Sequence, residues 1–233
     1  MTADRNGTAR PIVRRLVQIG AVVVVYAVLL FVSAGRWDWI AGWAYLGIYV
    51  GFIAVNAAVM LPSRRELIAE RGRVAGNVQR WDLVLAALYL VCGAALLVVA
   101  GLDERRGWTP AWPMWVPVAG GVLMAAGYSL FSWAMASNPF FSTVVRLQED
   151  RGQTVVTAGP YRFVRHPGYL GGLLTTLGTP FLLGSWPAMA PALAVAVIII
   201  VRTVLEDRML RRHLAGYAGY AARVPYRLLP GLW

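Results

Sequence analysis

The residue types best suited to chemistry gather in the run GPYRFVRHPGY, residues 159–169, directly before an apolar segment. Proline at the first position of a helix leaves His166 just outside the first turn, where free backbone N–H groups can meet an anion. Gly168, Gly171 and Gly172 leave one helix face bare, which admits either a flat ligand or a neighbouring helix. The run is typical of a binding site at the mouth of a helix, although arginines and tyrosines also anchor helices at a membrane surface.

A second polar group follows about 35 residues after this run. Arg202 and Glu206 lie four residues apart and therefore share one face of a helix. Glu206 and Asp207 adjoin an apolar run, where carboxylates are costly unless they are paired or used. The spacing fits either a simple Arg202–Glu206 ion pair or a functional site.

The elements that must position these residues are membrane helices. Hydrophobic residues make up 58% of the 233 residues and charged residues 14%, whereas a soluble domain carries about 25% charged residues. A membrane span needs about 20 mainly apolar residues, and such runs are Val17–Ala34, Trp39–Leu61, Leu83–Leu102 and Trp115–Ala136. Two shorter runs, Gly168–Leu183 and Met189–Val204, could form a tight hairpin or a partly re-entrant pair. We expect an all-α, polytopic integral membrane bundle of five to six transmembrane helices.

Polar segments separate the apolar runs. The pattern SRRELIAERGRV predicts a short amphipathic helix ended by Gly72. Ser137–Pro167 is the longest polar stretch, and Glu206–Trp233 predicts a surface helix followed by an extended tail. Without repeats or low-complexity linkers the chain forms one integrated domain, with N-terminal transmembrane helices in residues 1–137 and a C-terminal region in residues 138–233.

The arginines predict the orientation. All 22 Lys+Arg residues are arginines, and nineteen lie in segments on one side of the membrane, against Arg36, Arg105 and Arg106 on the other. The positive-inside rule then makes both termini and both polar C-terminal segments cytoplasmic, and the membrane is the inner or plasma membrane if the source is bacterial. The net charge of +11 lies beside apolar runs, which favours anionic lipid over nucleic acid as a partner. Cys92 is the single cysteine, so we expect neither an intrachain disulfide nor a cysteine metal site.

Three motifs carry a family resemblance: TVVTAGPYRFVRHPGYLG, then EDRML, then YAGYAARVPYRLLPGLW. Together they resemble the isoprenylcysteine carboxyl methyltransferase family, integral membrane enzymes that use S-adenosyl-L-methionine, and share the broader pattern of the related phospholipid N-methyltransferases. The resemblance covers Asn138–Trp233, whereas the first four spans match only in being hydrophobic. The chain departs from the family at Asp207, where a second glutamate is usual, and at His213–Tyr217, where the segment FG-x-x-Y is one residue shorter.

The resemblance implies a site made of the polar C-terminal segments. Arg202 matches the position that meets the substrate carboxylate, and Arg202 and Glu206 are the expected catalytic residues. The implied cofactor contacts are Gln148, Gln153, Thr154, Val155, Val156, Tyr161, His166, Pro167, Gly168, Tyr169 and Glu206.

We therefore expect a membrane methyltransferase of the protein-S-isoprenylcysteine O-methyltransferase type, acting on a lipophilic or lipidated substrate among membrane lipids. A carboxylate acceptor is ionised at neutral pH and needs an arginine but no base, whereas an amine must first lose a proton. Arg202 beside Glu206 therefore favours a carboxylate. The alternatives are a phosphatidylethanolamine N-methyltransferase, an NADPH-dependent reductase of the sterol-reductase type, and a non-enzymatic membrane protein with a degenerate site.

Overall fold

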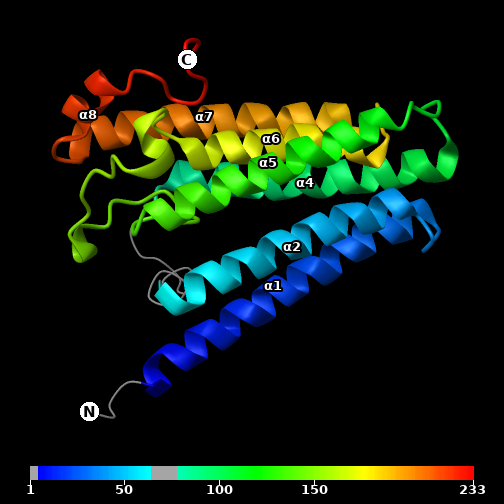
Figure 1. Ribbon diagram of the computed structural model, residues 1–233, viewed down its shortest axis with the longest axis horizontal. Helices are drawn as coiled ribbons and strands as arrows, with labels where there is room; N and C mark the ends of the chain where they lie inside the picture. Colours follow the sequence, from blue (N-terminus) through cyan, green and yellow to red (C-terminus); the bar gives the residue numbers. More distant parts are fainter. Residues whose placement is uncertain (1–4, 64–77) are drawn as a thin grey trace.

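The chain folds into helices joined by turns and loops. The computed structural model describes residues 5–63 and 78–233, and no strand occurs among them (Figure 1). Among these residues, five helices are long and apolar enough to cross a membrane: α1 (Arg5–Ala34), α2 (Ile40–Ser63), α4 (Arg80–Arg106), α5 (Trp115–Ser137) and α7 (Met189–His213). The expected all-α polytopic bundle is confirmed. The amphipathic helix expected before Gly72 lies outside the described residues.

The shorter elements belong to the C-terminal part. They are α6 (Pro167–Leu183), α8 (Tyr217–Arg223) and two 3-10 turns between α5 and α6, η1 (Glu149–Arg151) and η2 (Gly159–Arg162). The turns after α1, α4 and α6 lie at one end of the bundle, and the N-terminal end of α1, the α5–α6 loop and α8 lie at the other (Figure 1). This alternation agrees with the side-to-side alternation of the arginines.

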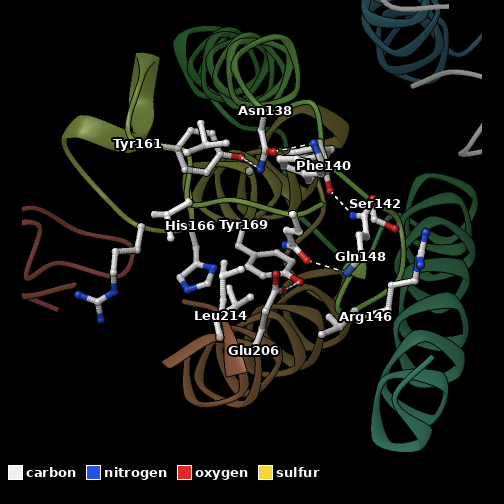
Figure 2. Close-up of a pocket in the computed structure, with 18 of the residues that line it drawn as sticks. Asn138, Phe140, Ser142, Arg146, Gln148, Tyr161, His166, Tyr169, Glu206 and Leu214 are labelled. Carbon is white, nitrogen blue, oxygen red and sulfur yellow. Dashed lines mark hydrogen bonds between the residues drawn. The ribbon is translucent and has the colours of Figure 1, made fainter. Parts of the chain in front are cut away.

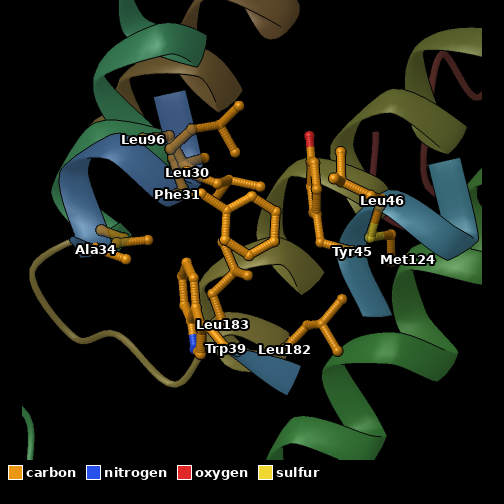
Figure 3. Packing of buried hydrophobic residues seen from close by; sticks show 14 residues of the cluster. Leu30, Phe31, Ala34, Trp39, Tyr45, Leu46, Leu96, Met124, Leu182 and Leu183 are labelled. Atoms are coloured by element: carbon orange, nitrogen blue, oxygen red, sulfur yellow. The ribbon is translucent and has the colours of Figure 1, made fainter. Parts of the chain in front are cut away.

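A compact apolar core holds the first of these two ends together (Figure 3). Phe31 and Leu30 of α1, Tyr45 of α2 and Leu96 of α4 are among its buried side chains. At Gly101 of α4 a β-carbon would lie 2.7 Å from the carbonyl oxygen of Leu30, so α1 and α4 cross almost in backbone contact. Away from the α1–α2 turn, these two helices incline away from the other helices, α1 toward its N-terminal end and α2 toward its C-terminal end (Figure 1).

Helices α5 and α6 pack closely through glycines. Gly127 and Gly171 face each other, and a β-carbon on either one would lie 2.6 Å from the other's carbonyl oxygen. Seven residues, or two helical turns, farther along α6, a β-carbon on Gly178 would likewise lie 2.8 Å from the carbonyl oxygen of Gly120. The bare face of α6 therefore serves helix packing at Gly171, as small residues often do in membranes.

Helices α6 and α7 form a hairpin, and its turn lies at the same end of the bundle as the turns after α1 and α4 (Figure 1). Its turn contains Gly184 at φ +71°, and the Trp186 N–H donates to Thr109 Oγ1 in the turn after α4 at 3.0 Å. The expected hairpin is therefore present, and the depth to which it enters a membrane stays a prediction. The expected end of the last apolar run at Val204 was wrong, because α7 continues to His213 and includes Glu206. The short surface helix is α8 instead.

Candidate active site

A cavity of about 310 Å³ lies at the end of the bundle opposite the apolar core (Figure 2). Its walls come from the C-terminal end of α5, the α5–α6 loop, the first turn of α6, the C-terminal half of α7, and α8. Tyr89 of α4 completes the wall and is 41% exposed. The size falls in the range of small-molecule sites, about 300–1,000 Å³.

The residues singled out from the sequence converge on this cavity. Pro167 is the exception, since it is buried at the first position of α6 and starts the helix without lining the cavity. The others all line it: Gln148, Gln153, Thr154, Val155, Val156, Tyr161, His166, Gly168, Tyr169, Arg202 and Glu206. Two segments more than 30 residues apart in sequence are thus brought to one chamber.

The α5–α6 loop is held by its own side chains. Asn138 Oδ1 accepts the Phe140 N–H at 2.8 Å, and its Nδ2 donates to the Tyr161 hydroxyl at 3.2 Å (Figure 2). Gln148 donates from Nε2 to the Phe140 carbonyl and accepts from Arg151 at Oε1, both at 2.6 Å. Because both atoms of its amide are engaged, Gln148 shapes the cavity by fixing the loop, and a direct cofactor contact stays a prediction.

His166 faces the cavity with one nitrogen and a buried carboxylate with the other. Nε2 lies 3.4 Å from Asp207 Oδ1 and 3.4 Å from the Tyr217 hydroxyl, which itself donates to Asp207 Oδ1 at 3.0 Å. Because the Asp207 carboxylate can only accept a hydrogen bond, pairing with it places the proton of the ring on Nε2 and leaves Nδ1 free. No described residue hydrogen-bonds to Nδ1.

Asp207 is the centre of an arginine cluster behind this histidine. Arg165 contacts both carboxylate oxygens at 2.8 and 3.2 Å, and Arg211 and Arg227 reach Oδ2 at 3.2 and 3.1 Å. The side chains of Asp207 and Arg165 are 0% and 1% exposed. Arg165 and His166 also donate their backbone N–H groups to Tyr226 and Arg227, each at 2.9 Å. The cluster therefore ties α6, α7 and the C-terminal segment to one buried charge.

Burial raises the pKa of the two tyrosine hydroxyls of α8. Burial, followed by the nearby Asp207 carboxylate, raises the pKa of Tyr217 well above its usual value, so the hydroxyl stays a donor. Burial likewise raises the pKa of Tyr220 to about 12, and its hydroxyl donates to the Tyr161 carbonyl at 2.7 Å.

Glu206 and Arg202 do not pair with each other, contrary to the simplest interpretation of their spacing. Glu206 Oε2 accepts from the Tyr169 hydroxyl, and the two side chains meet in the middle of the cavity (Figure 2). Arg202 instead forms an ion pair with Asp82 of α4, with Nε and Nη2 at 2.6 and 3.1 Å from the carboxylate oxygens. Among the described residues, none forms an ion pair with Glu206.

Reasoning from the sequence missed Asp82 as a residue of this site. Asp82 stands at the start of an apolar run, and only the cost of a carboxylate there could have marked it. Asp207 appeared as a departure from the family, and Arg165 as part of a basic run; their mutual pairing across 42 positions has no local signal.

Comparison with known proteins places these elements in a family context. A family model described as phospholipid methyltransferase matches residues 115–216. Protein-S-isoprenylcysteine O-methyltransferase B of Arabidopsis thaliana is 33% identical over 88 residues, 36% of this chain and 44% of that protein. The Homo sapiens protein-S-isoprenylcysteine O-methyltransferase is 30% identical over 123 residues, 49% of this chain and 43% of that protein.

Over part of its length this chain is similar to the isoprenylcysteine O-methyltransferases. The expected resemblance is therefore confirmed, and the cobalt-zinc-cadmium resistance protein CzcN of Cupriavidus metallidurans is a further similar protein, 38% identical over 77 residues, 32% of this chain and 35% of that protein. The chain spans less than half the length of these curated relatives.

The segment shared with the phospholipid methyltransferase model contains most of the cavity but not all of it. It runs from the start of α5 to Gly216 and so includes His166, Arg202 and Glu206. Asp82 and Tyr89 of α4 precede it, and Tyr217 of α8 follows it. The cavity of this chain is thus lined in part by residues outside the matched segment, such as Tyr89 and Tyr217.

Proposed function

We propose that this chain is an integral membrane methyltransferase that uses S-adenosyl-L-methionine and methylates a carboxylate of a lipophilic, isoprenylcysteine-like acceptor at the cytoplasmic membrane face. The observation that carries the proposal is the cavity's combination of a carboxylate without a cationic partner, Glu206, with the free Nδ1 of His166 and with Arg202. Relatedness to the isoprenylcysteine O-methyltransferases supports the reaction class.

The cavity lining fits the chemical groups of S-adenosylmethionine. Among the described residues, nothing hydrogen-bonds to the backbone of Thr154–Val156, which leaves donors and acceptors for an adenine edge beside the apolar Val155 and Val156 side chains. Glu206 Oε1 has no hydrogen-bond partner in the described part of the chain and suits an ammonium or a ribose hydroxyl. His166 Nδ1 suits the amino-acid end.

Little proton chemistry is needed from the protein. S-adenosylmethionine supplies a methyl group on a sulfonium, and its transfer is an in-line displacement that requires alignment and exclusion of water. Arg202 holds the acceptor carboxylate, which is already ionised at neutral pH. Tyr169 keeps Glu206 in place through its hydroxyl. The guanidinium carbon of Arg202 lies over the Tyr169 ring, 5.5 Å from the ring centroid. The half-exposed Tyr89 supports entry of the apolar part of the acceptor from the lipid.

The test is a titration of S-adenosylmethionine into detergent-solubilised protein. His166→Ala and Glu206→Gln should each weaken binding about tenfold to 100-fold, since a hydrogen bond to a charged group contributes about 1.5–3 kcal/mol. Arg202→Ala should leave cofactor affinity unchanged but abolish methyl transfer to N-acetyl-S-farnesylcysteine. Asp38→Asn, at the opposite end of the molecule, is the control for both measurements. Wild-type affinity in both of the first two variants would contradict the site.

A second candidate, phospholipid N-methylation, has the family model as its supporting observation. It would use the same cofactor site with an ethanolamine headgroup as the acceptor. Offering dioleoylphosphatidylethanolamine and N-acetyl-S-farnesylcysteine to the same preparation separates the two. Methylation of the lipid amine alone would replace the carboxylate proposal with this one.

A further inference from the structure

Asp82 links three walls of the cavity through one buried carboxylate. It lies in the first turn of α4 and is 0% exposed. Its oxygens accept Nε and Nη2 of Arg202 from α7, and Oδ2 also accepts the Val145 N–H from the α5–α6 loop at 2.7 Å. Tyr89, two turns along the same helix, lines the cavity. One face of α4 is therefore directed at Arg202.

The pairing leaves Arg202 with a single free edge. Nη2 donates both to Asp82 and to the Thr143 carbonyl, at 3.1 and 2.9 Å, and Nε is taken by Asp82. Within the described residues Nη1 has no acceptor. A carboxylate that enters the cavity can therefore accept hydrogen bonds from Arg202 through Nη1 alone. The bidentate contact that arginine usually makes with a carboxylate is blocked.

A one-pronged contact matters for methyl ester formation. The attacking carboxylate oxygen must direct a lone pair at the methyl carbon, and an arginine bound to both oxygens would withdraw electron density from it and constrain its direction. With one oxygen on Nη1, the other forms the ester bond while the methyl–sulfur bond breaks and its electron pair stays on sulfur. No proton moves in this step.

We propose that Asp82 is a positioning residue, which orients Arg202 so that an acceptor carboxylate binds through one oxygen and reacts through the other. This inference rests on the proposed function. It assigns a role in the reaction to a helix that precedes the segment shared with the phospholipid methyltransferase model.

The first test separates turnover from binding with N-acetyl-S-farnesylcysteine as the acceptor. In Asp82→Asn the neutral amide no longer fixes the guanidinium of Arg202, so the guanidinium can bind both oxygens of the acceptor carboxylate. We expect kcat to fall about tenfold or more, because small misplacements of bound reactants cost up to about 100-fold, while KM stays equal or decreases. Affinity for S-adenosylhomocysteine should stay within about twofold. An unchanged kcat, or a higher KM with kcat retained, would overturn the proposal.

A second variant tests the same geometry with Asp82 retained. Lysine has one nitrogen, which Asp82 would occupy, so Arg202→Lys should lose acceptor binding as fully as Arg202→Ala. Adding Asp82→Asn to Arg202→Lys should release the ammonium and lower KM again. Near-normal turnover of Arg202→Lys, or additive losses in the double variant, would contradict the assignment.

Asp103 offers a matched control on the same helix. It is 3% exposed and accepts the N–H and hydroxyl of Thr109 at 2.8 and 2.6 Å, about 30 Å from Asp82 along α4 at 1.5 Å per residue. Asp103→Asn should lower thermal stability but keep kcat and KM. Equal kinetic losses in both aspartate variants would make Asp82 merely structural. Failure of the proposed function would instead appear in wild-type protein, as no cofactor binding or no methylation of this probe.

Discussion

Replacing Asp207 with asparagine tests whether the arginine cluster stabilises the fold. The substitution keeps the size of the side chain, so no cavity forms and the change is electrostatic. Its main effect falls on Arg165, whose side chain is 1% exposed and whose charge would lose its counter-charge. Removing one partner of a buried ion pair costs about 3–5 kcal/mol.

The surroundings favour the lower part of that range. Arg165 Nη1 keeps two carbonyl acceptors, Val224 and Pro225, each at 2.7 Å. Arg211 and Arg227, with side chains 43% and 28% exposed, regain water when they lose Asp207 and add little. We therefore expect a loss of about 3 kcal/mol. For a chain of this length each kcal/mol lowers the midpoint by about 2–4 °C, so the unfolding temperature should fall by about 6–12 °C.

The assay is tryptophan-fluorescence thermal unfolding of the detergent-solubilised protein at neutral pH. Asp38→Asn is a matched control, because Asp38 also binds both prongs of an arginine, Arg36, at 2.8 and 2.9 Å but is 76% exposed. That variant should unfold at the wild-type temperature. A shift below about 2 °C for Asp207→Asn, or an equal shift for Asp38→Asn, would refute the reasoning.

Three further predictions concern packing, pH and orientation. Gly127→Ala and Gly171→Ala should each destabilise the protein by about 1–3 kcal/mol through overpacking of α5 on α6, whereas Gly93→Ala, with open space around its β-carbon, should not, as thermal unfolding will show. Since the pKa of Tyr220 is raised to about 12 in the folded state, above about 10 when unfolded, its contribution is complete below pH 10. That contribution is lost as the pH rises through 12, so the unfolding temperature of Tyr220→Phe should decline less than that of wild type over this window. In a Cys92→Ser background, Asp38→Cys should react with an impermeant maleimide added to intact cells, and Asp150→Cys only after permeabilisation; the reverse pattern would overturn the cytoplasmic assignment.

The helices were predictable because membrane spans depend on local composition. The runs Val17–Ala34 and Trp115–Ala136 end at or next to the ends of α1 and α5, although α1 begins earlier, at Arg5. The end of α7 was not predictable from hydropathy, since the charged residues from Arg202 onward resemble the edge of a span. The partners of these residues lie inside the bundle. Arg202 pairs with Asp82, 120 positions away, and Asp207 contacts Arg165 and His166, 42 and 41 positions away. Helical geometry therefore continues where the apolar run stops.

In the candidate site, the identity of the lining residues was predictable from the sequence, but their contacts were not. Its lining residues could be named because the motifs resemble a family, and eleven of the twelve line one cavity. What each side chain contacts could not be named, because pairing depends on three-dimensional proximity. The i,i+4 spacing of Arg202 and Glu206 favours their pairing on an isolated helix, but Asp82 offers Arg202 a fully buried carboxylate, and Glu206 is left to Tyr169.

Both basic groups that the proposal uses have a buried aspartate behind them. Asp207 lies behind His166, and Asp82 lies behind Arg202. In a bundle surrounded by lipid, a guanidinium facing a small cavity is costly without a counter-charge, because a low dielectric raises the free-energy cost of an uncompensated charge. Asp82 supplies that counter-charge to Arg202, and the two aspartates fix which nitrogen faces the cavity, Nδ1 of His166 and Nη1 of Arg202. Glu206 is then the carboxylate of the lining without a cation among the described residues, which favours a positively charged cofactor in this chamber.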